Sequence, residues 1–133
     1  MMFIDTSAVV AILARERDAA EYSAKIAAAK RRLCAGHVVL EAAMRLSSLL
    51  GVDPRDAEDA ITQMFVDAGI EFVPVDAAVA REAVAAFARF GKGRGHRARL
   101  NFGDCLSYAC ARVHGARLLF KGADFTATDI ERA

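Results

Sequence analysis

The chain has 133 residues, of which 55% are hydrophobic and 26% are charged, and its formal net charge is +1. This length is typical of one domain, residues 1–133, with a core large enough to fold without disulfides or a structural metal. A net charge near zero excludes the strong positive field of many nucleic-acid-binding proteins, so contact with nucleic acid would need a local basic patch.

The cysteines and the hydropathy pattern give information about the compartment. Cys34, Cys105 and Cys110 are odd in number and show no C-x-x-C spacing, which argues against a disulfide framework and a zinc site. No secretion signal is visible at the N-terminus, and no apolar run approaches the roughly 20 residues that a membrane span needs. We therefore expect reduced thiols in a cytoplasmic protein that does not contact a membrane.

Short apolar segments alternate with amphipathic ones along the chain. In chain order we predict a strand at 2–5, helices at 7–16 and 18–31, a strand at 32–36, helices at 37–51 and 53–69, a strand at 70–75, helices at 76–91 and 101–115, and a strand at 116–122. Thr6 or Ser7 is expected to cap the first helix, Asp53 to cap the helix that starts with Pro54, and Gly51 to end the helix before it.

This alternation predicts an α/β fold, a three-layer α/β/α sandwich around a mainly parallel sheet. In such sheets ligands bind beyond the carboxyl ends of the strands. Asp5 follows the first predicted strand directly, so its carboxylate is expected at that edge.

Three other acidic residues occupy comparable positions. Glu41 lies early in the helix after the second strand, Asp104 in the first turn of the helix opened by Asn101, and Asp124 just after the last strand. Carboxylates that meet at one edge repel each other unless they are protonated or a cation neutralises them. Oxygen ligands without a nearby histidine or cysteine favour Mg²⁺, with Mn²⁺ as an alternative.

Each acid also has a simpler interpretation. Asp5 could only cap a helix, Glu41 could be a solvated surface residue, and Asp124 could be a turn residue. Asp104 stands three residues after Asn101, which is the spacing of a capping box. The spacings between the four acids are too long for the sequence to prove that they meet.

Several strings in order resemble one family. FIDTSAVVAIL at 3–13, a helical Glu41, NFGDCLSYACAR at 101–112 and LLFKGADFTATDI at 118–130 together resemble the PIN-domain family, and within it the VapC toxin ribonucleases of bacterial toxin–antitoxin pairs. The resemblance spans essentially the whole chain. It implies a parallel sheet of about five strands, with a very short fifth strand because the chain stops soon after T-D-I.

The resemblance also implies an activity and its residues. It implies a Mg²⁺-dependent endoribonuclease with Asp5, Glu41, Asp104 and Asp124 as the catalytic acids, of which the three aspartates are the expected metal ligands. A further implication is that the hydroxyl of Thr6 or Ser7 assists and that Asn101 lines the same pocket. Position 123 is alanine where many members carry a polar or acidic residue, but the acid that matches the motif is Asp124.

The only strongly basic stretch, 91–99, has three glycines among its charges. It could be a solvated loop, or an arm whose Arg94 and Arg97 contact RNA phosphates. Its glycine spacing is not that of a nucleotide-binding P-loop. Arg112 and Lys121 are expected to face the same edge as the acids.

The apolar helices carry more hydrophobic residues than one small core needs. They could be ordinary core, or they could form a homodimer face and a groove for a helix of the small cognate antitoxin that the resemblance implies.

Two other classes of α/β protein use acidic residues after their first strand, but the sequence lacks their motifs. A receiver-like signalling domain would need an acidic pair after its first strand, and a haloacid-dehalogenase-like phosphatase would need D-x-D where this chain has D-x-S. A PIN-like RNA-binding protein without catalysis is the remaining alternative, and the presence of all four acids argues against it.

Overall fold

Four parallel strands form the centre of the protein, seen in a computed structural model that describes residues 1–133. The elements are β1 (Met2–Ile4), α1 (Thr6–Leu13), α2 (Ala19–Ala28), β2 (Arg32–Cys34), α3 (Gly36–Leu50), α4 (Pro54–Asp67), β3 (Glu71–Phe72), α5 (Ala77–Phe90), α6 (Phe102–Val113) and β4 (Arg117–Leu119). The strand order is β3-β2-β1-β4, and every pair is parallel. All the carboxyl ends therefore lie at one edge.

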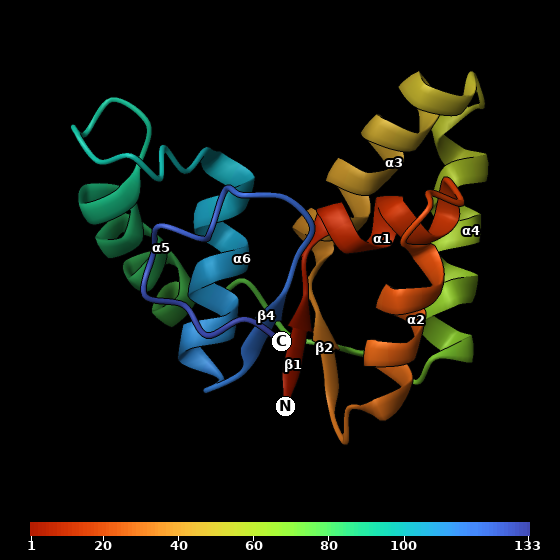
Figure 1. The fold of residues 1–133 in the computed structure, drawn as a ribbon, viewed down its shortest axis with the longest axis horizontal. Coiled ribbons are helices and arrows are strands. Elements are labelled where there is room, and N and C mark those ends of the chain that lie inside the picture. The colour runs from red at the N-terminus through yellow and green to blue at the C-terminus, as the bar shows by residue number, and fades with distance from the viewer.

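The helices cover both faces of this sheet. Figure 1 shows α5 and α6 on one side of the strands and α1 to α4 on the other. The helix pairs with the most extensive contacts are α5 with α6 and α3 with α4. Residues 91–101 connect the first pair, and residues 51–53 connect the second. The predicted three-layer α/β/α sandwich is confirmed.

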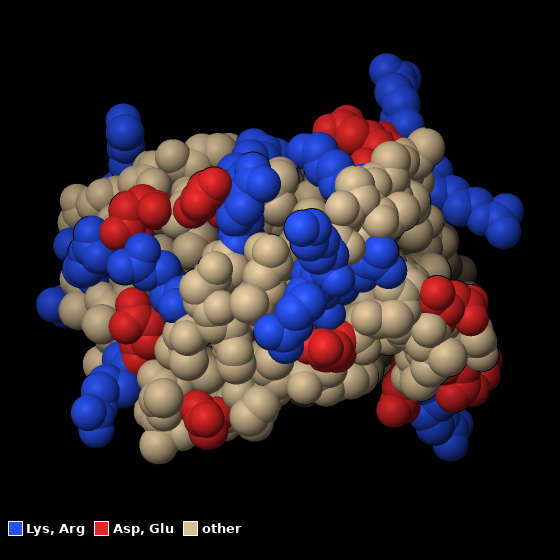
Figure 2. All heavy atoms as spheres, turned by 90° about the horizontal axis from the view of Figure 1, so that it is seen from below, with Lys and Arg blue, Asp and Glu red and all other residues tan.

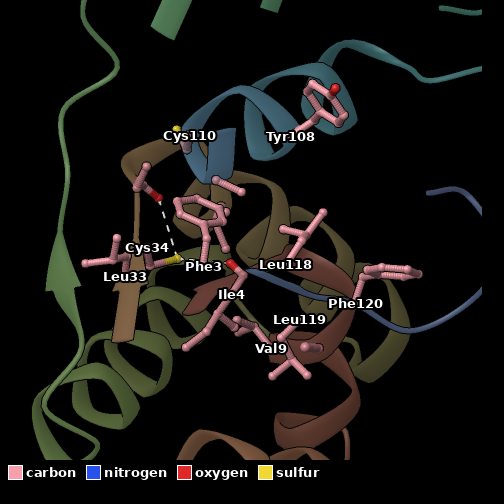
Figure 3. Close-up of a cluster of buried hydrophobic side chains, with 14 of the residues drawn as sticks. Phe3, Ile4, Val9, Leu33, Cys34, Tyr108, Cys110, Leu118, Leu119 and Phe120 are labelled. Atoms are coloured by element: carbon pink, nitrogen blue, oxygen red, sulfur yellow. Dashed lines mark hydrogen bonds between the residues drawn. The ribbon is translucent and has the colours of Figure 1, made fainter. Parts of the chain in front are cut away.

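The strands are apolar along their length because helices bury both of their faces. Phe3 pairs with Leu33 on one side and with Leu118 on the other, and all three side chains are fully buried. Figure 3 shows them in one cluster with Ile4 and Cys34, whose thiol lies 3.4 Å from the carbonyl oxygen of Ile4. One continuous core of 36 buried hydrophobic residues surrounds this centre.

The ends of several helices follow the sequence signals. Gly51 adopts the left-handed conformation, with φ of 65°, directly after α3, and Asp53 accepts a hydrogen bond from the backbone N–H of Arg55 at the start of α4. The expected cap of α1 was wrong by one or two residues. Asp5 is the N-cap, and its carboxylate accepts the N–H of Ser7.

The sheet is smaller than expected, with four strands and not five. The third strand is only Glu71–Phe72, and both residues are exposed because this strand lies at the sheet edge. In place of a fifth strand, Arg132 forms a single parallel bridge with Leu118. Two hydrogen bonds hold it, because the N–H groups of Leu118 and Ala133 donate to the carbonyl oxygens of Glu131 and Leu118.

The last thirteen residues fold back along α6 and end beside β4 without forming a helix (Figure 1). Phe125 is buried against Phe120, with ring centroids 5.1 Å apart, and the guanidinium of Arg132 stacks 4.3 Å from the Phe120 ring. The buried Tyr108 of α6 donates its hydroxyl hydrogen to the carboxylate of Asp129. This tail therefore belongs to the packed structure.

The surface opposite the carboxyl ends of the strands carries charges of both signs. Figure 2, which views this end, shows Lys and Arg side chains interspersed with Asp and Glu and no uniform basic field. None of the helices has the length and apolar character that a membrane span requires.

The hydrogen bond between Tyr108 and Asp129 gives a prediction about stability. Tyr108→Phe should lower the free energy of unfolding by about 1–2 kcal/mol, because a buried hydrogen bond to a charged acceptor is lost. Chemical denaturation would measure the change. Tyr22→Phe is the matched control, since Tyr22 is also buried but its hydroxyl bonds to no other group of the protein. Equal effects of the two substitutions would contradict this role of Asp129.

Candidate active site

Asp5 stands at the carboxyl end of β1, where strand and helix meet. Its side chain is 4% exposed, and its backbone N–H donates to the carbonyl oxygen of Leu119 in β4 over 3.0 Å. One carboxylate oxygen, Oδ2, accepts two hydrogen bonds from Ser7, from the N–H at 3.0 Å and from the hydroxyl at 2.6 Å. Local bonds to the start of α1 therefore fix the direction of this carboxylate.

Glu41 reaches the same region from α3. Its Oε1 accepts a hydrogen bond from the hydroxyl of Thr6, the residue next to Asp5, and Thr6 is itself buried. This contact spans 35 positions of sequence and joins α3 to the start of α1. Glu41 is half-buried, so the interpretation as a freely solvated surface residue is wrong.

Asp104 lies in the first turn of α6 and completes the capping box that the sequence predicts. Its N–H donates to Oδ1 of Asn101 at 2.9 Å, and its Oδ2 accepts the N–H of Asn101 at 3.1 Å. Asp104 is 9% exposed, so one carboxylate oxygen caps the helix while the group as a whole is withdrawn from water.

The pKa of Asp104 reflects its burial and the charges of the other three acids. Burial raises the pKa of Asp104 to about 7, although the hydrogen bond from the backbone of Asn101 acts in the opposite direction. The negative charges of Asp5, Asp124 and Glu41 each raise this pKa further. We call these four residues the acidic cluster.

No basic side chain neutralises the acidic cluster. None of its members forms an ion pair. The ammonium group of Lys121, three residues before Asp124, instead contacts Glu16 at 2.6 Å and Asp18 at 3.0 Å. Lys121 contributes to the site through its backbone, whose N–H donates to the hydroxyl of Ser7 at 2.9 Å. The cluster therefore carries an excess of negative charge.

The donor atoms fit a hard divalent cation, since all are carboxylate oxygens. No three Asp, Glu, His or Cys side chains are close enough together to hold one ion directly. A divalent cation here would therefore take at most two of these carboxylates as direct ligands and complete its coordination with water.

Asp124 and the basic stretch lie at the rim of the site. Asp124 is exposed in the segment after β4. In the same segment, Ala123, Thr126 and Ala127 line a hollow of about 400 Å³ together with Arg97. Residues 91–99, which we call the basic loop, thus pass beside the segment that carries Asp124.

The basic loop is a closed structure. Gly91 and Leu100 form a bridge at its neck, with Lys92 N–H donating to the Leu100 carbonyl at 2.9 Å. Inside it, His96 accepts the N–H of Ala98 and contacts the Phe90 ring edge-on at 4.9 Å between centroids. Arg94 and Arg97 remain exposed and form no ion pair, so the loop presents free guanidinium groups.

Arg112 does not lie where the sequence analysis expected it. It stands in the last turn of α6, eight residues beyond Asp104, and borders a separate hollow with Glu82 and Asp129. At a rise of about 1.5 Å per residue, this places it roughly 12 Å further along the helix. Arg112 is therefore not part of the site.

The sequence analysis did not single out two residues that join α3 to α6 near the site. His37 on α3 and Ser107 on α6 face each other, with Nε2 and Oγ 3.0 Å apart, and the second ring nitrogen of His37 is buried without a partner. Burial lowers the pKa of His37, which favours the neutral ring. The spacing could have predicted that these residues lie on the same helix faces as the acids, because His37 precedes Glu41 by four residues and Ser107 follows Asp104 by three.

Comparison with known proteins is consistent with this geometry. The family model described as "PIN domain" matches residues 2–131. VapC ribonuclease Mb0640 of Mycobacterium bovis is 43% identical over 97% of this chain and 95% of its own length. Ribonuclease VapC28 of Mycobacterium tuberculosis is 44% identical over 99% of this chain and 97% of its own length.

A solved structure supports the fold. The Mycobacterium tuberculosis toxin VapC20, described as cleaving the sarcin-ricin loop, superposes with a TM-score of 0.77 at 20% identity, over 100% of this chain and 98% of its own. The chain belongs to the PIN-domain family. Its curated relatives within that family are VapC ribonucleases, which confirms the resemblance seen in the sequence and rules out a receiver-like or phosphatase domain.

The raised pKa of Asp104 predicts how the stability of the metal-free protein depends on pH. The unfolded carboxyl ionises near pH 4 and the folded one near pH 7, so the native state is penalised increasingly between these values and constantly above them. Asp104→Asn should therefore raise the free energy of unfolding at pH 8 by about 2–4 kcal/mol, at roughly 1.4 kcal/mol per pKa unit.

Denaturation in EDTA at pH 8 and at pH 4 would test this, and the gain should vanish at the lower pH. Asp59→Asn on the exposed face of α4 is the matched control and should change stability little. A gain for Asp104→Asn that persists undiminished at pH 4 would contradict the electrostatic explanation.

Proposed function

We propose that the chain is an endoribonuclease that hydrolyses RNA phosphodiester bonds and acts as the toxin of a type II toxin–antitoxin pair. The observation that carries the proposal is the acidic cluster, in which the buried Asp104 experiences the charges of Asp5, Glu41 and Asp124 and none of the four forms an ion pair. The relatives' names, ribonuclease and toxin, support the same activity. Such a protein would act in the cytoplasm, where its RNA substrate is found.

The cofactor that we propose is Mg²⁺, with Mn²⁺ as a substitute, held directly or through water by Asp5, Asp104 and Asp124. When bound, the ion would polarise the phosphodiester and lower the pKa of the water that attacks it. Glu41 is the fourth catalytic acid and orients that water. The Oδ2 oxygens of Asp5 and Asp104 each bond to their own helix start, which leaves the Oδ1 oxygens as the ones available to the cation.

The resemblance implies that a hydroxyl of Thr6 or Ser7 assists, and the hydrogen bonds of the two hydroxyls next to Asp5 indicate how. Ser7 donates to Asp5, and Thr6 donates to Glu41. Each hydroxyl has one hydrogen to donate, and that hydrogen is already used. We therefore assign Thr6 and Ser7 to orienting the acids.

We propose that the RNA passes between the acidic cluster and the basic loop. Arg94 and Arg97 would contact phosphates, with Arg97 beside the segment that carries Asp124. Asn101 is exposed at the start of α6 and could donate its side-chain amide to the RNA, since its oxygen caps the helix. Guanidinium groups without an acidic partner suit this task because no internal ion pair has to be broken first.

A small cognate antitoxin of the VapB kind would bind an apolar groove on the α1–α4 side. A groove of about 640 Å³ runs between α2 and α4, with Ile12, Leu13, Ile26 and Met64 among its lining residues. An amphipathic helix that places its apolar side chains in such a groove is a recurrent mode of recognition. Ile26 belongs to the core, whereas Ile12, Leu13 and Met64 only pack against it and stay partly exposed, so an antitoxin helix would cover these three.

A second copy of the chain is the partner that we propose for the other side. A hollow of about 400 Å³ between α5 and α6 is lined only by apolar residues, including Val84, Phe87 and Phe102. Phe102 is 84% exposed, which is costly for a side chain of this size unless a partner covers it. A homodimer through this face would bury it and leave the α2–α4 groove free for the antitoxin.

The nuclease proposal predicts that activity depends on the cation and on Asp5. Purified protein freed of antitoxin should cut discrete sites in total RNA with Mg²⁺, and EDTA should abolish the cleavage. Asp5→Asn should reduce the rate about a hundredfold or more, because a ligand charge is lost from the site. Gel or sequencing analysis of the products would also identify the RNA that is cut.

Asp76→Asn is the matched control, because Asp76 caps α5 as Asp5 caps α1 but belongs to a different part of the fold. It should keep full activity. A fully active Asp5→Asn protein would refute the assignment of the acidic cluster. Absence of cleavage by a folded protein that binds Mn²⁺ would favour the catalytically silent, RNA-binding alternative.

The proposed RNA path predicts a difference between two arginines. Arg97→Ala should raise the KM several-fold and make binding less dependent on salt, since each phosphate contact contributes about one unit to the slope of affinity against salt concentration. Arg112→Ala removes the same charge from the far end of α6 and should change neither quantity. Titrations with labelled RNA at several salt concentrations would measure both, and equal behaviour of the two variants would argue against the basic loop as the path.

A further inference from the structure

A side chain at position 103 of α6 would meet the carboxylate of Glu41. A Cβ added there would lie 2.5 Å from Oε2 of Glu41, 3.0 Å from its Cδ and 3.1 Å from its Oε1. Real Cβ atoms do not approach other heavy atoms to less than 3.0 Å. Either residue 103 lacks a side chain or the carboxylate of Glu41 moves.

The carboxylate is held on its other side. Oε1 accepts the hydroxyl of Thr6, which is buried and directly follows Asp5. Glu41 is thus confined between a hydroxyl of α1 and the backbone of α6. Moving it away from residue 103 would break or bend the bond to Thr6.

The backbone of Gly103 gives no other reason for glycine. Its φ lies outside the left-handed region, so any residue could adopt its conformation. Glycine inside a helix is less favourable than alanine because it has more conformational freedom to lose on folding. Gly103 therefore weakens the first turn of α6, and the contact with Glu41 is the feature of the structure that requires it.

We propose that Gly103 is a positioning residue of the acidic cluster. By carrying no side chain, it lets the start of α6 come close to Glu41 and directs the Glu41 carboxylate toward Asp104, the next residue in the chain. This inference rests on the proposed nuclease function for its effect on catalysis, but the contact itself is independent of that function.

Gly103→Ala is the variant that tests this inference, with Gly36→Ala as the matched control. Gly36 is the first residue of α3, and an added Cβ there meets nothing within 4 Å. Gly103→Ala should lower kcat by about tenfold to a hundredfold, the effect of a displacement near 1 Å in an active site, and leave KM for RNA nearly unchanged. Gly36→Ala should keep the wild-type kcat.

Thermal unfolding of the metal-free proteins provides the second readout, in a double-mutant cycle with Glu41→Ala. In the Glu41→Ala background the obstruction is gone, so Gly103→Ala should raise the Tm as Gly36→Ala does. In the wild-type background the same substitution should raise the Tm less or lower it. This non-additivity measures the contact between the two residues.

Additive Tm changes, or an unchanged kcat for Gly103→Ala, would overturn the inference. If Gly103→Ala alone fails to fold, the double variant must fold, because removing Glu41 removes the clash; a double variant that also fails would equally overturn it. Failure of the proposed function looks different. In that case the wild type cuts no RNA, while the Tm cycle remains non-additive.

Discussion

Pairing of β1 with a parallel strand on each side is the interaction on which the site depends. It places the end of β1 between β2 and β4, and the bond from Asp5 N–H to the carbonyl oxygen of Leu119 extends that pairing to the acid itself. The chain beyond β4 then returns a hydrogen bond from Lys121 to Ser7, which holds Asp5. Segments more than a hundred positions apart are thereby joined at one carboxylate.

Two acids of the proposed site also cap helices, so the simpler interpretation that the sequence allowed for each is confirmed, and it leaves room for the metal-binding role that we propose. Asp5 caps α1, and Asp104 forms a capping box with Asn101. Capping uses one carboxylate oxygen and fixes the torsions of the side chain, while the second oxygen stays free. A short-range interaction thus orients a group whose chemistry depends on long-range contacts, which makes the geometry of the cluster less sensitive to motion of the helices.

Much of the fold could be predicted from the sequence, because local chemistry determines it. The alternation of elements, the stop at Gly51 and the Asn101 cap depend on residues a few positions apart. Contacts between distant elements could not be predicted in this way. The contacts of Thr6 with Glu41 and of His37 with Ser107 depend on how α3 packs against α1 and α6. The periodicity of the sequence does not specify this packing. The error at Arg112 was avoidable, since the helical rise alone places it far from Asp104.

The charges of the chain are nearly balanced in number and mixed over the surface of Figure 2, but the acidic cluster and the basic loop form no ion pair with each other, and this separation suits an RNA nuclease. The acidic cluster would repel a phosphodiester, and only a bound cation reverses that field. The basic loop lies close by, but Arg94 and Arg97 form no ion pair with the acids. If they did, each charge would neutralise the other and neither would be left for a ligand. The bridge between Gly91 and Leu100 closes the neck of the basic loop, and the loop passes beside the segment that carries Asp124 without an ion pair to it, so both sets of charges are left for the cation and the RNA that we propose.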